Sequence, residues 1–361
     1  MYMRVSISYL AIAALAVSVF TGCGNSETAK APAISGSESS AQAVSSNEPV
    51  SESVFAMDIY MTITAYDGEI IRAVSESIDK IKQLEALWNV NDEGSDIYKI
   101  NNSSEPVSVD EQTAELMSFS LGMCESTNGA LDITLYPVLR EWGFTTGEYK
   151  VPDEDIISEL MKNTGYEKVV LDGNTVTTPA GVMTDLGSVG KGRTGDCVAE
   201  IMRGCGVTSA LLDLGGNIQV VGRKTDGSKW KIGLKDPYVR GNFGILEAED
   251  TAVITSGGYE RYFEQDGEVY WHILDPAAGS PAKNGIISAT AVGSEGRLCD
   301  ALSTSLFVMG EERAKKYWRS RGDFEMILVT DDDRVLITEG LEDSYTSGGL
   351  FSETEVIRRD S

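Results

Sequence analysis

Histidine is the scarcest reactive residue in this 361-residue chain, which contains only His272. A single histidine excludes a zinc centre built from several imidazoles, because such centres draw on three or four protein ligands. It leaves room for one general acid or base, because an imidazole titrates near neutral pH.

Cysteine is also sparse, with five residues and no CxxC pair or zinc-like spacing. Apart from Cys23 near the N-terminus, the cysteines are Cys124, Cys197, Cys205 and Cys299. We expect these four to be buried thiols. The sequence selects no disulfide pair among them.

Positive charge is in short supply, with 30 Lys and Arg against 56 Asp and Glu and a formal net charge of −26. This balance excludes a nucleic-acid binder, which needs clustered basic residues for phosphate contacts. The same charge repels anionic lipid headgroups and anionic nucleotides. Attachment to a membrane therefore needs a separate anchor. A nucleotide site needs a bound metal or a local lysine to offset the repulsion.

The apolar run over residues 9–20 is too short to span a bilayer comfortably, but small residues and Cys23 follow it directly. This arrangement predicts a lipoprotein signal over residues 1–22, lipidation of Cys23 and attachment to the extracytoplasmic face of the cell membrane. An ordinary signal peptide and an uncleaved anchor are the alternatives. Residues 23–50 are rich in Ser, Ala, Glu and Pro and read as a flexible tether.

Apolar periodicity predicts helices interleaved with many short strands in residues 51–361. The helices are expected at 70–88, 111–126, 153–162, 194–202, 298–307 and 311–319. The strands are expected at 55–65, 168–171, 175–178, 182–186, 210–214, 218–222, 230–234, 252–255, 259–264, 269–274 and 286–292, with a last hairpin around 330–334. Frequent hairpins between helices indicate an α+β fold with mostly antiparallel sheet, in a single compact catalytic unit.

The segment over residues 184–192 reads as a strand ending at Asp185, a glycine-rich turn, and a helix start beside Lys191. Glycines let the backbone approach a ligand, and helix N-terminal N–H groups attract anions. By spacing alone, a tight strand–helix turn with no ligand explains the pattern equally well.

Asp300 and Thr304 are four residues apart on a predicted helix, so their oxygens share one face. A carboxylate with a hydroxyl suits Mg²⁺, which prefers oxygen ligands and substrate phosphates. Alternatively, Asp300 caps the helix and Thr304 is solvated. His272 precedes the break at Leu274-Asp275-Pro276 and is either a base or a hydrogen-bonded structural residue. Asp132 follows a helix end and belongs either to a site or to a simple turn.

Several short motifs together resemble the ApbE family of FAD:protein FMN transferases, from about Met57 to Gly310. The agreeing pieces, in family order, are Met57 with Met61-Thr62-Ile63-Thr64; Ser95 to Asn101; Gly129-Ala130-Leu131-Asp132-Ile133-Thr134; Trp142-Gly143-Phe144; Asp185-Leu186-Gly187 with Lys191-Gly192; Asp213-Leu214-Gly215-Gly216-Asn217; Thr255-Ser256-Gly257 with Tyr259-Glu260-Arg261; His272 with Asp275-Pro276; and Asp300-Ala301-Leu302-Ser303-Thr304.

The resemblance implies an ApbE-like fold that binds FAD as substrate together with Mg²⁺. The implied FAD contacts are Met57, Asn91, Ala130, Leu131, Asp132, Asp185, Lys191 and Leu274. The implied metal ligands are the side chains of Asp300 and Thr304 and the backbone carbonyl of Ser188.

The implied reaction transfers FMN from FAD to a Thr or Ser hydroxyl of an exported flavoprotein and releases AMP, with His272 as the base. FAD hydrolysis to FMN and AMP is the nearest alternative. A non-catalytic FAD-binding lipoprotein and an extracytoplasmic scaffold with a degenerate site are more distant ones.

Overall fold

The computed structural model describes residues 48–238, 241–351 and 353–359. The predicted signal segment, Cys23 and most of the predicted tether lie outside this range. The part that is described belongs to one compact unit, Ser46–Ser361. Within it, no helix has the length and apolarity needed to cross a membrane.

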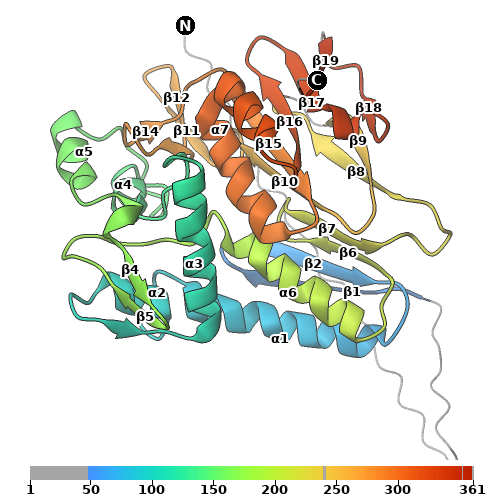
Figure 1. Ribbon diagram of the computed structural model, residues 1–361, viewed down its shortest axis with the longest axis horizontal. Helices are drawn as coiled ribbons and strands as arrows, with labels where there is room; N and C mark the ends of the chain where they lie inside the picture. Colours follow the sequence, from blue (N-terminus) through green and yellow to red (C-terminus); the bar gives the residue numbers. More distant parts are fainter. Residues whose placement is uncertain (1–47, 239–240, 352, 360–361) are drawn as a thin grey trace, which may run out of the picture. The chain divides into compact units, whose positions relative to one another are not determined.

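The centre of the unit is a nine-stranded sheet in the order β1-β2-β6-β7-β10-β15-β16-β17-β19 (Figure 1). Every neighbouring pair is antiparallel except β17 and β19, which run parallel. Its strands are β1 (Val50–Ala56), β2 (Ile59–Ala65), β6 (Ser209–Asp213), β7 (Ile218–Gly222), β10 (Ala252–Gly257), β15 (Ile286–Gly293), β16 (Glu325–Thr330), β17 (Arg334–Thr338) and β19 (Glu353–Ile357). The predicted α+β class with mostly antiparallel sheet is confirmed.

Three helices pack against one face of this sheet, and a small second sheet covers part of the other. The three are α1 (Ile70–Trp88), α6 (Gly190–Gly204) and α7 (Gly296–Arg319), and the other helices are α2 (Asp96–Asn101), α3 (Glu111–Ser126), α4 (Tyr136–Glu141) and α5 (Glu154–Met161). The second sheet contains β8 (Trp230–Lys235), β9 (Asn242–Ala248) and β18 (Tyr345–Ser347). In β10, Ile254 faces the core beneath α7 whereas Val253 faces the β8–β9 side. This alternation places apolar cores on both sides of the central strands.

Further short strands form small sheets in the described part of the unit. They are β3 (Val107–Ser108) with β4 (Val170–Asp172) and β5 (Thr175–Thr177), β11 (Tyr262–Gln265) with β12 (Glu268–Trp271), and β13 (Leu274–Asp275) with β14 (Ser280–Pro281). The hairpin of β11 and β12 ends one residue before His272. The hairpin therefore fixes the backbone position of the only histidine.

The predicted strand over residues 55–65 is wrong in its continuity, because a hairpin turn divides it into β1 and β2. Met57 and Asp58 form the turn, with φ of 51° and 61°. Two consecutive positive φ values are typical of the tight turn that matches the twist of antiparallel strands. The alternating pattern continues across this turn, which hides it from a periodicity argument.

Other boundaries also differ from the predictions. Residues 182–186 form no strand, and α6 begins at Gly190 rather than at Thr194. Helices α2 and α4 are too short for periodicity to reveal. The predicted helices at 298–307 and 311–319 are the two halves of α7, which are separated by Gly310 at φ 72° and ψ 173°.

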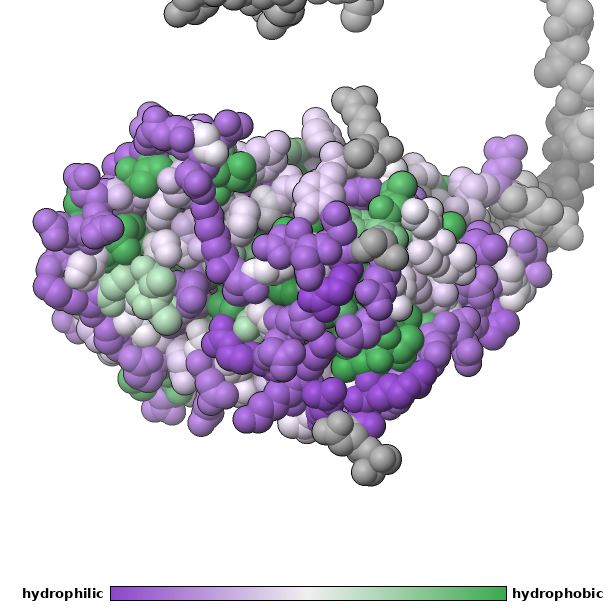
Figure 2. All heavy atoms as spheres, turned by 90° about the horizontal axis from the view of Figure 1, so that it is seen from above, coloured by the Kyte–Doolittle hydropathy of each residue, from purple (hydrophilic) through white to green (hydrophobic). Residues whose placement is uncertain are grey.

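Hydrophilic side chains dominate the face shown in Figure 2, and the hydrophobic ones form separate small patches. The four cysteines beyond Cys23 are buried and unpaired, as predicted. Burial raises the pKa of the Cys124 thiol to about 12. Burial also raises the pKa of the Cys197 and Cys299 thiols, so these three cysteines are packing residues rather than nucleophiles.

Candidate functional site

The site is built where α6 and α7 cross with their backbones almost in contact. A Cβ atom at Gly192 would lie 2.2 Å from the carbonyl oxygen of Gly296, and one at Gly296 would lie 2.6 Å from the carbonyl oxygen of Gly192. Only glycine permits this approach at either position. The crossing brings the start of α6 against the buried side of α7, where Asp300 lies.

The Asp300 carboxylate is 3% exposed and is held from three directions. Its Oδ2 accepts from the Gly192 N–H at 2.8 Å, and its Oδ1 accepts from Asn217 Nδ2 at 2.9 Å. The Lys191 ammonium lies 3.6 Å from Oδ1. Gly192 is the third residue of α6, so its N–H has no carbonyl partner inside the helix. The Asp300 side chain, which lies on α7, therefore accepts from a free N–H group at the N-terminus of α6.

The Ser188 carbonyl precedes the hydrogen-bond ladder of α6. The first bond of that ladder runs from the Arg193 N–H to the Val189 carbonyl at 3.0 Å, and the Gly190 N–H turns back to the Leu186 carbonyl at 2.8 Å. Neither bond uses Ser188. Its carbonyl is thus outside the helix and is chemically suited to a cation.

Thr304 lies one helical turn after Asp300 and faces β10. Its hydroxyl is 3.2 Å from Ser256 Oγ, which is 2.8 Å from Ser303 Oγ. The predicted pair at i and i+4 is therefore part of a larger group of hydroxyls that joins α7 to β10.

The donor set of Asp300, Thr304 and the Ser188 carbonyl fits Mg²⁺ in its chemistry. All three donors are hard oxygens, which Mg²⁺ prefers. Among the described residues there is no cluster of three or more His, Cys, Asp or Glu of the kind that holds zinc. The buried Asp300 carboxylate supplies the one negative charge of this donor set.

His272 is half-buried at the end of β12 and is oriented by the backbone of Arg261. The His272 N–H donates to the Arg261 carbonyl at 3.1 Å, and the ring Nδ1 is 3.2 Å from the same oxygen. A carbonyl oxygen only accepts, so Nδ1 carries the proton in this hydrogen bond. In the neutral ring this leaves the Nε2 lone pair as the position that takes a proton.

Burial lowers the pKa of His272 to about 4, and the positive charges of Arg261 and Lys191 contribute further. A ring with this pKa is neutral at pH 7, so its Nε2 lone pair is free, and the lowered pKa makes it a weaker base than an exposed imidazole. The effect of Lys191 also shows that His272 and the start of α6 share one electrostatic environment.

Asp185 lies in the turn that leads to α6, where its Oδ1 accepts from the Gly187 N–H at 2.7 Å. Burial raises the pKa of this carboxyl, and Lys191 and Arg261 oppose the rise. The Lys191 ammonium also donates to the Gly187 carbonyl at 3.3 Å. Lys191 thus contacts both the Asp185 turn and Asp300, and its charge, together with that of Arg261, also acts on His272.

Asp132 organises the loop of predicted FAD contacts. Its Oδ1 accepts from the N–H and hydroxyl of Thr134, at 2.8 and 2.6 Å, and its Oδ2 accepts from the Tyr166 N–H at 3.2 Å. Burial raises the pKa of the Asp132 carboxyl. Ala130 and Leu131 are buried beside it. The backbone of this loop meets the Asp185 segment, because the Asp185 N–H donates to the Ile133 carbonyl at 2.8 Å.

The other predicted FAD contacts occupy three separate places. Met57 forms the β1–β2 turn, its N–H donates to Glu85 Oε1 at 2.9 Å, and its sulfur lies 3.7 Å from the Thr194 hydroxyl oxygen. Leu274 is buried in an aromatic cluster with Trp142. Asn91 lies on the exposed loop after α1, where its N–H donates to Asn89 Oδ1. Its bonds are local and give it no link to Asp300 or His272.

Sequence reasoning missed the residues that hold the site residues in place. Asn217 and Ser256 were quoted only as parts of motifs, although they contact Asp300 and Thr304 directly. Arg261 acts through its carbonyl, which no residue pattern reveals. The sequence feature that could have indicated Asn217 is its position beside Gly216 after a strand end. For Ser256 it is the position beside Gly257 within a strand.

Comparison with known proteins matches the part of the chain that carries these features. The model of the ApbE family matches residues 57–328. The FAD:protein FMN transferase of Vibrio cholerae is 32% identical over 286 residues, which cover 75% of this chain and 86% of that protein. The FAD:protein FMN transferase of Treponema pallidum is 30% identical over 296 residues, covering 76% and 82%. The crystal structure of the ApbE protein of Thermotoga maritima has a TM-score of 0.77 at 31% identity and covers 82% of this chain and 99% of that one.

Proposed function

The chain belongs to the ApbE family and is a flavin transferase, and from this premise we propose the finer chemistry of its reaction. It transfers FMN from FAD to a threonine or serine hydroxyl of an exported flavoprotein, with Mg²⁺ as cofactor and AMP as the second product. The observation that carries the proposal is that Lys191, at the start of α6, contacts the buried Asp300 carboxylate and also acts electrostatically on the neutral His272 ring.

His272 serves as the base for the acceptor hydroxyl. Support comes from its tautomer, because the Arg261 carbonyl holds the proton on Nδ1 and leaves Nε2 to accept one. The hydroxyl oxygen forms a bond to the phosphorus of the FMN half, and the bond from this phosphorus to the bridging oxygen breaks. The hydroxyl proton moves to His272, and AMP leaves with the bridging oxygen.

Lys191 and Arg261 supply positive charge for the FAD diphosphate. They are needed because the chain as a whole is strongly acidic and repels an anionic substrate. Asp300, Thr304 and the Ser188 carbonyl would hold Mg²⁺, whose charge offsets that of the diphosphate when it is bound. Of the remaining predicted FAD contacts, the Asp132 loop is joined to the Asp185 segment through the bond from the Asp185 N–H to the Ile133 carbonyl.

We also propose that a lipid on Cys23 holds the enzyme on the extracytoplasmic face of the membrane. The short apolar segment before Cys23 and the polar stretch after it support this location. Replacing Cys23 with alanine would move the protein out of the membrane fraction if the lipid is the anchor.

The function is tested by incubating the full-length chain with FAD, Mg²⁺ and an exported flavoprotein that carries an acceptor threonine. We expect flavin fluorescence that stays with the acceptor band on a denaturing gel, together with AMP in equal amount. Replacing the acceptor threonine with alanine is the matched control. Free FMN without labelled acceptor would instead identify an FAD pyrophosphatase, and bound FAD without products would identify a carrier.

A further inference from the structure

We propose that Ser256 is a positioning residue that turns the lone pairs of the Thr304 hydroxyl toward the cation site. The inference rests on the proposed function, since it assumes that Thr304 contributes to holding Mg²⁺. Ser256 lies on β10 and contacts α7 through two hydroxyls.

The direction of each bond in the hydroxyl group follows from counting hydrogens. The Ser303 hydroxyl is 3.0 Å from the Asp300 carbonyl, which only accepts, so Ser303 donates its single hydrogen there. Ser303 must then accept from Ser256 across 2.8 Å. With its hydrogen used, Ser256 in turn accepts from Thr304 across 3.2 Å.

The direction of these hydrogen bonds determines which side of the Thr304 oxygen carries its hydrogen and which side carries its lone pairs. Its hydrogen points toward β10, so its lone pairs are left for other partners. A cation binds only through lone pairs, and a hydroxyl hydrogen directed at it would oppose binding. The group therefore sets the hydroxyl in its binding orientation before the cation arrives.

The same group also blocks the competing orientation. A Ser or Thr inside a helix commonly donates to the carbonyl four residues earlier. Thr194 does so to the Gly190 carbonyl at 2.7 Å, and Ser305 does so to the Ala301 carbonyl at 2.7 Å. For Thr304 that carbonyl belongs to Asp300, and the Ser303 hydroxyl already occupies it. Ser256 thus provides the only acceptor that the described contacts give to the Thr304 hydrogen.

The test measures metal binding directly, using the full-length chain with FAD and titrating Mn²⁺ by electron paramagnetic resonance. Loss of a residue that orients a metal ligand commonly weakens affinity by about 10- to 100-fold. We expect Ser256→Ala to weaken Mn²⁺ binding by about 10-fold. We expect Ser256→Thr, which keeps the hydroxyl, to bind Mn²⁺ like the parent chain. FMN transfer by Ser256→Ala should recover at saturating Mg²⁺.

Ser305→Ala is the matched control, because it removes a buried hydroxyl from the same helix without touching this group. Thermal melting confirms that each variant is folded. If Ser256→Ala does not fold, Ser303→Ala tests the same idea, since it frees the Asp300 carbonyl for the Thr304 hydrogen. A folded Ser256→Ala or Ser303→Ala variant with unchanged Mn²⁺ affinity overturns the positioning role. A parent chain that binds no Mn²⁺ overturns the metal site of the proposed function, and the positioning role with it.

Discussion

The two halves of α7 handle charge in opposite ways. Before the break at Gly310, the helix buries Asp300 among two neutral hydrogen-bond donors and the single ammonium of Lys191. After the break, it carries Glu311 and Lys315 into a partly exposed ion cluster with the end of the central sheet. The first half buries one carboxylate with one ammonium, whereas the second half places several acidic and basic side chains in a partly exposed network of ion pairs.

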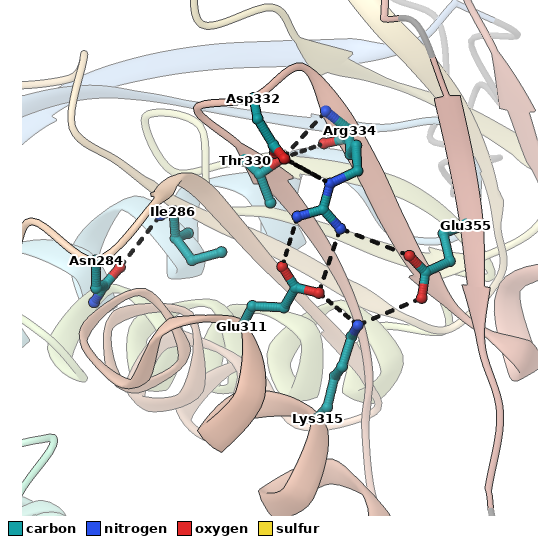
Figure 3. Close-up of polar contacts among 8 residues, drawn as sticks. All are labelled: Asn284, Ile286, Glu311, Lys315, Thr330, Asp332, Arg334 and Glu355. Atoms are coloured by element: carbon teal, nitrogen blue, oxygen red, sulfur yellow. Dashed lines mark hydrogen bonds and ion pairs between the residues drawn. The ribbon is translucent and has the colours of Figure 1, made fainter.

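The ion cluster is shown in Figure 3 and consists of Glu311, Lys315, Asp332, Arg334 and Glu355. Arg334 contacts Glu311 at 2.8 Å, Asp332 at 3.0 Å and Glu355 at 3.7 Å. Lys315 contacts Glu311 at 2.5 Å and Glu355 at 3.4 Å. These pairs join the second half of α7 to β17 and β19, so their role is to fix the helix to the sheet.

The break between the halves is itself capped. Asn284 Nδ2 donates to the Phe307 and Val308 carbonyls, each at 2.9 Å, and Arg313 donates to the Val308 and Met309 carbonyls, each at 2.8 Å. These donors satisfy carbonyls that lose their helical partners at Gly310. The comparison teaches that the half facing the candidate site carries its carboxylate buried and held by neutral donors as well as by Lys191, whereas the other half carries its charges in partly exposed ion pairs.

The largest effect is expected at Asp300. Asp300→Ala should lower FMN transfer by about 10³-fold, because it removes the charged ligand from the cation site. Asp300→Asn should lose nearly as much activity, since the neutral amide keeps the shape but not the charge. Glu311→Gln is the control from the other half of the helix and should transfer FMN normally. Near-normal activity of a folded Asp300→Ala chain at limiting Mg²⁺ would show that the metal assignment is wrong.

A somewhat smaller effect is expected at His272. His272→Ala should lower protein flavinylation by about 10²-fold, the usual contribution of a general base, while the affinity for FAD measured by calorimetry changes little. No other histidine exists in the chain to replace it. A variant that binds FAD poorly but turns over normally at saturation would place His272 in substrate binding.

The pH profile of the parent chain tests the same residue. Because the folded pKa of about 4 is below the usual value of 6.5, His272 stays deprotonated across neutral pH. Transfer should therefore fall on the acid side well below pH 6, and this limb should be absent in His272→Ala. The neutral ring contributes stability above pH 6.5, which is lost as the pH falls from 6.5 toward 4. A limb near neutrality would mean that bound substrate restores the ordinary pKa.

The helix crossing should show an effect on stability. Gly192→Ala places a Cβ 2.2 Å from the Gly296 carbonyl oxygen, so α6 and α7 must separate. We expect a loss of about 1–3 kcal/mol in the free energy of unfolding, measured with urea, because overpacking forces the backbone to shift. Gly204→Ala is the control on the same helix, since its Cβ meets nothing within 4 Å. Equal stability of the two variants would contradict the close crossing.

The smallest effect is expected in the ion cluster. Glu311→Gln should lower the free energy of unfolding by about 0.5–1 kcal/mol, because partly exposed ion pairs contribute little. The Arg334 hydrogen bond lowers the pKa of Glu311, so the contribution of this carboxylate is present above its unfolded pKa and is lost at acid pH. Thermal melts of the parent chain and of Glu311→Gln at low and high salt measure the contribution of this carboxylate to stability. A loss of several kcal/mol would mean that the two halves of α7 do not differ as described.

The local spacing of apolar residues was enough to predict most of the helices and strands around the site. The apolar spacing of residues 70–88 predicts α1, because a long amphipathic face is visible in sequence, and the predicted helix at 111–126 matches α3. The break of α7 was also predicted. The division of β1 and β2 was not, because the alternation runs through the Met57–Asp58 turn and only backbone geometry reveals it.

The sequence by itself determined the reactive residues: one histidine, a carboxylate and a hydroxyl one helical turn apart, and a lysine at a glycine-rich helix start. Only the tertiary structure decided how they are held. The partners of Asp300 come from positions 83 and 108 residues away, and the tautomer of His272 is set by a carbonyl 11 residues earlier. Periodicity describes neighbours on one element, whereas hydrogen-bond partners and backbone contacts between elements depend on packing that no single segment specifies.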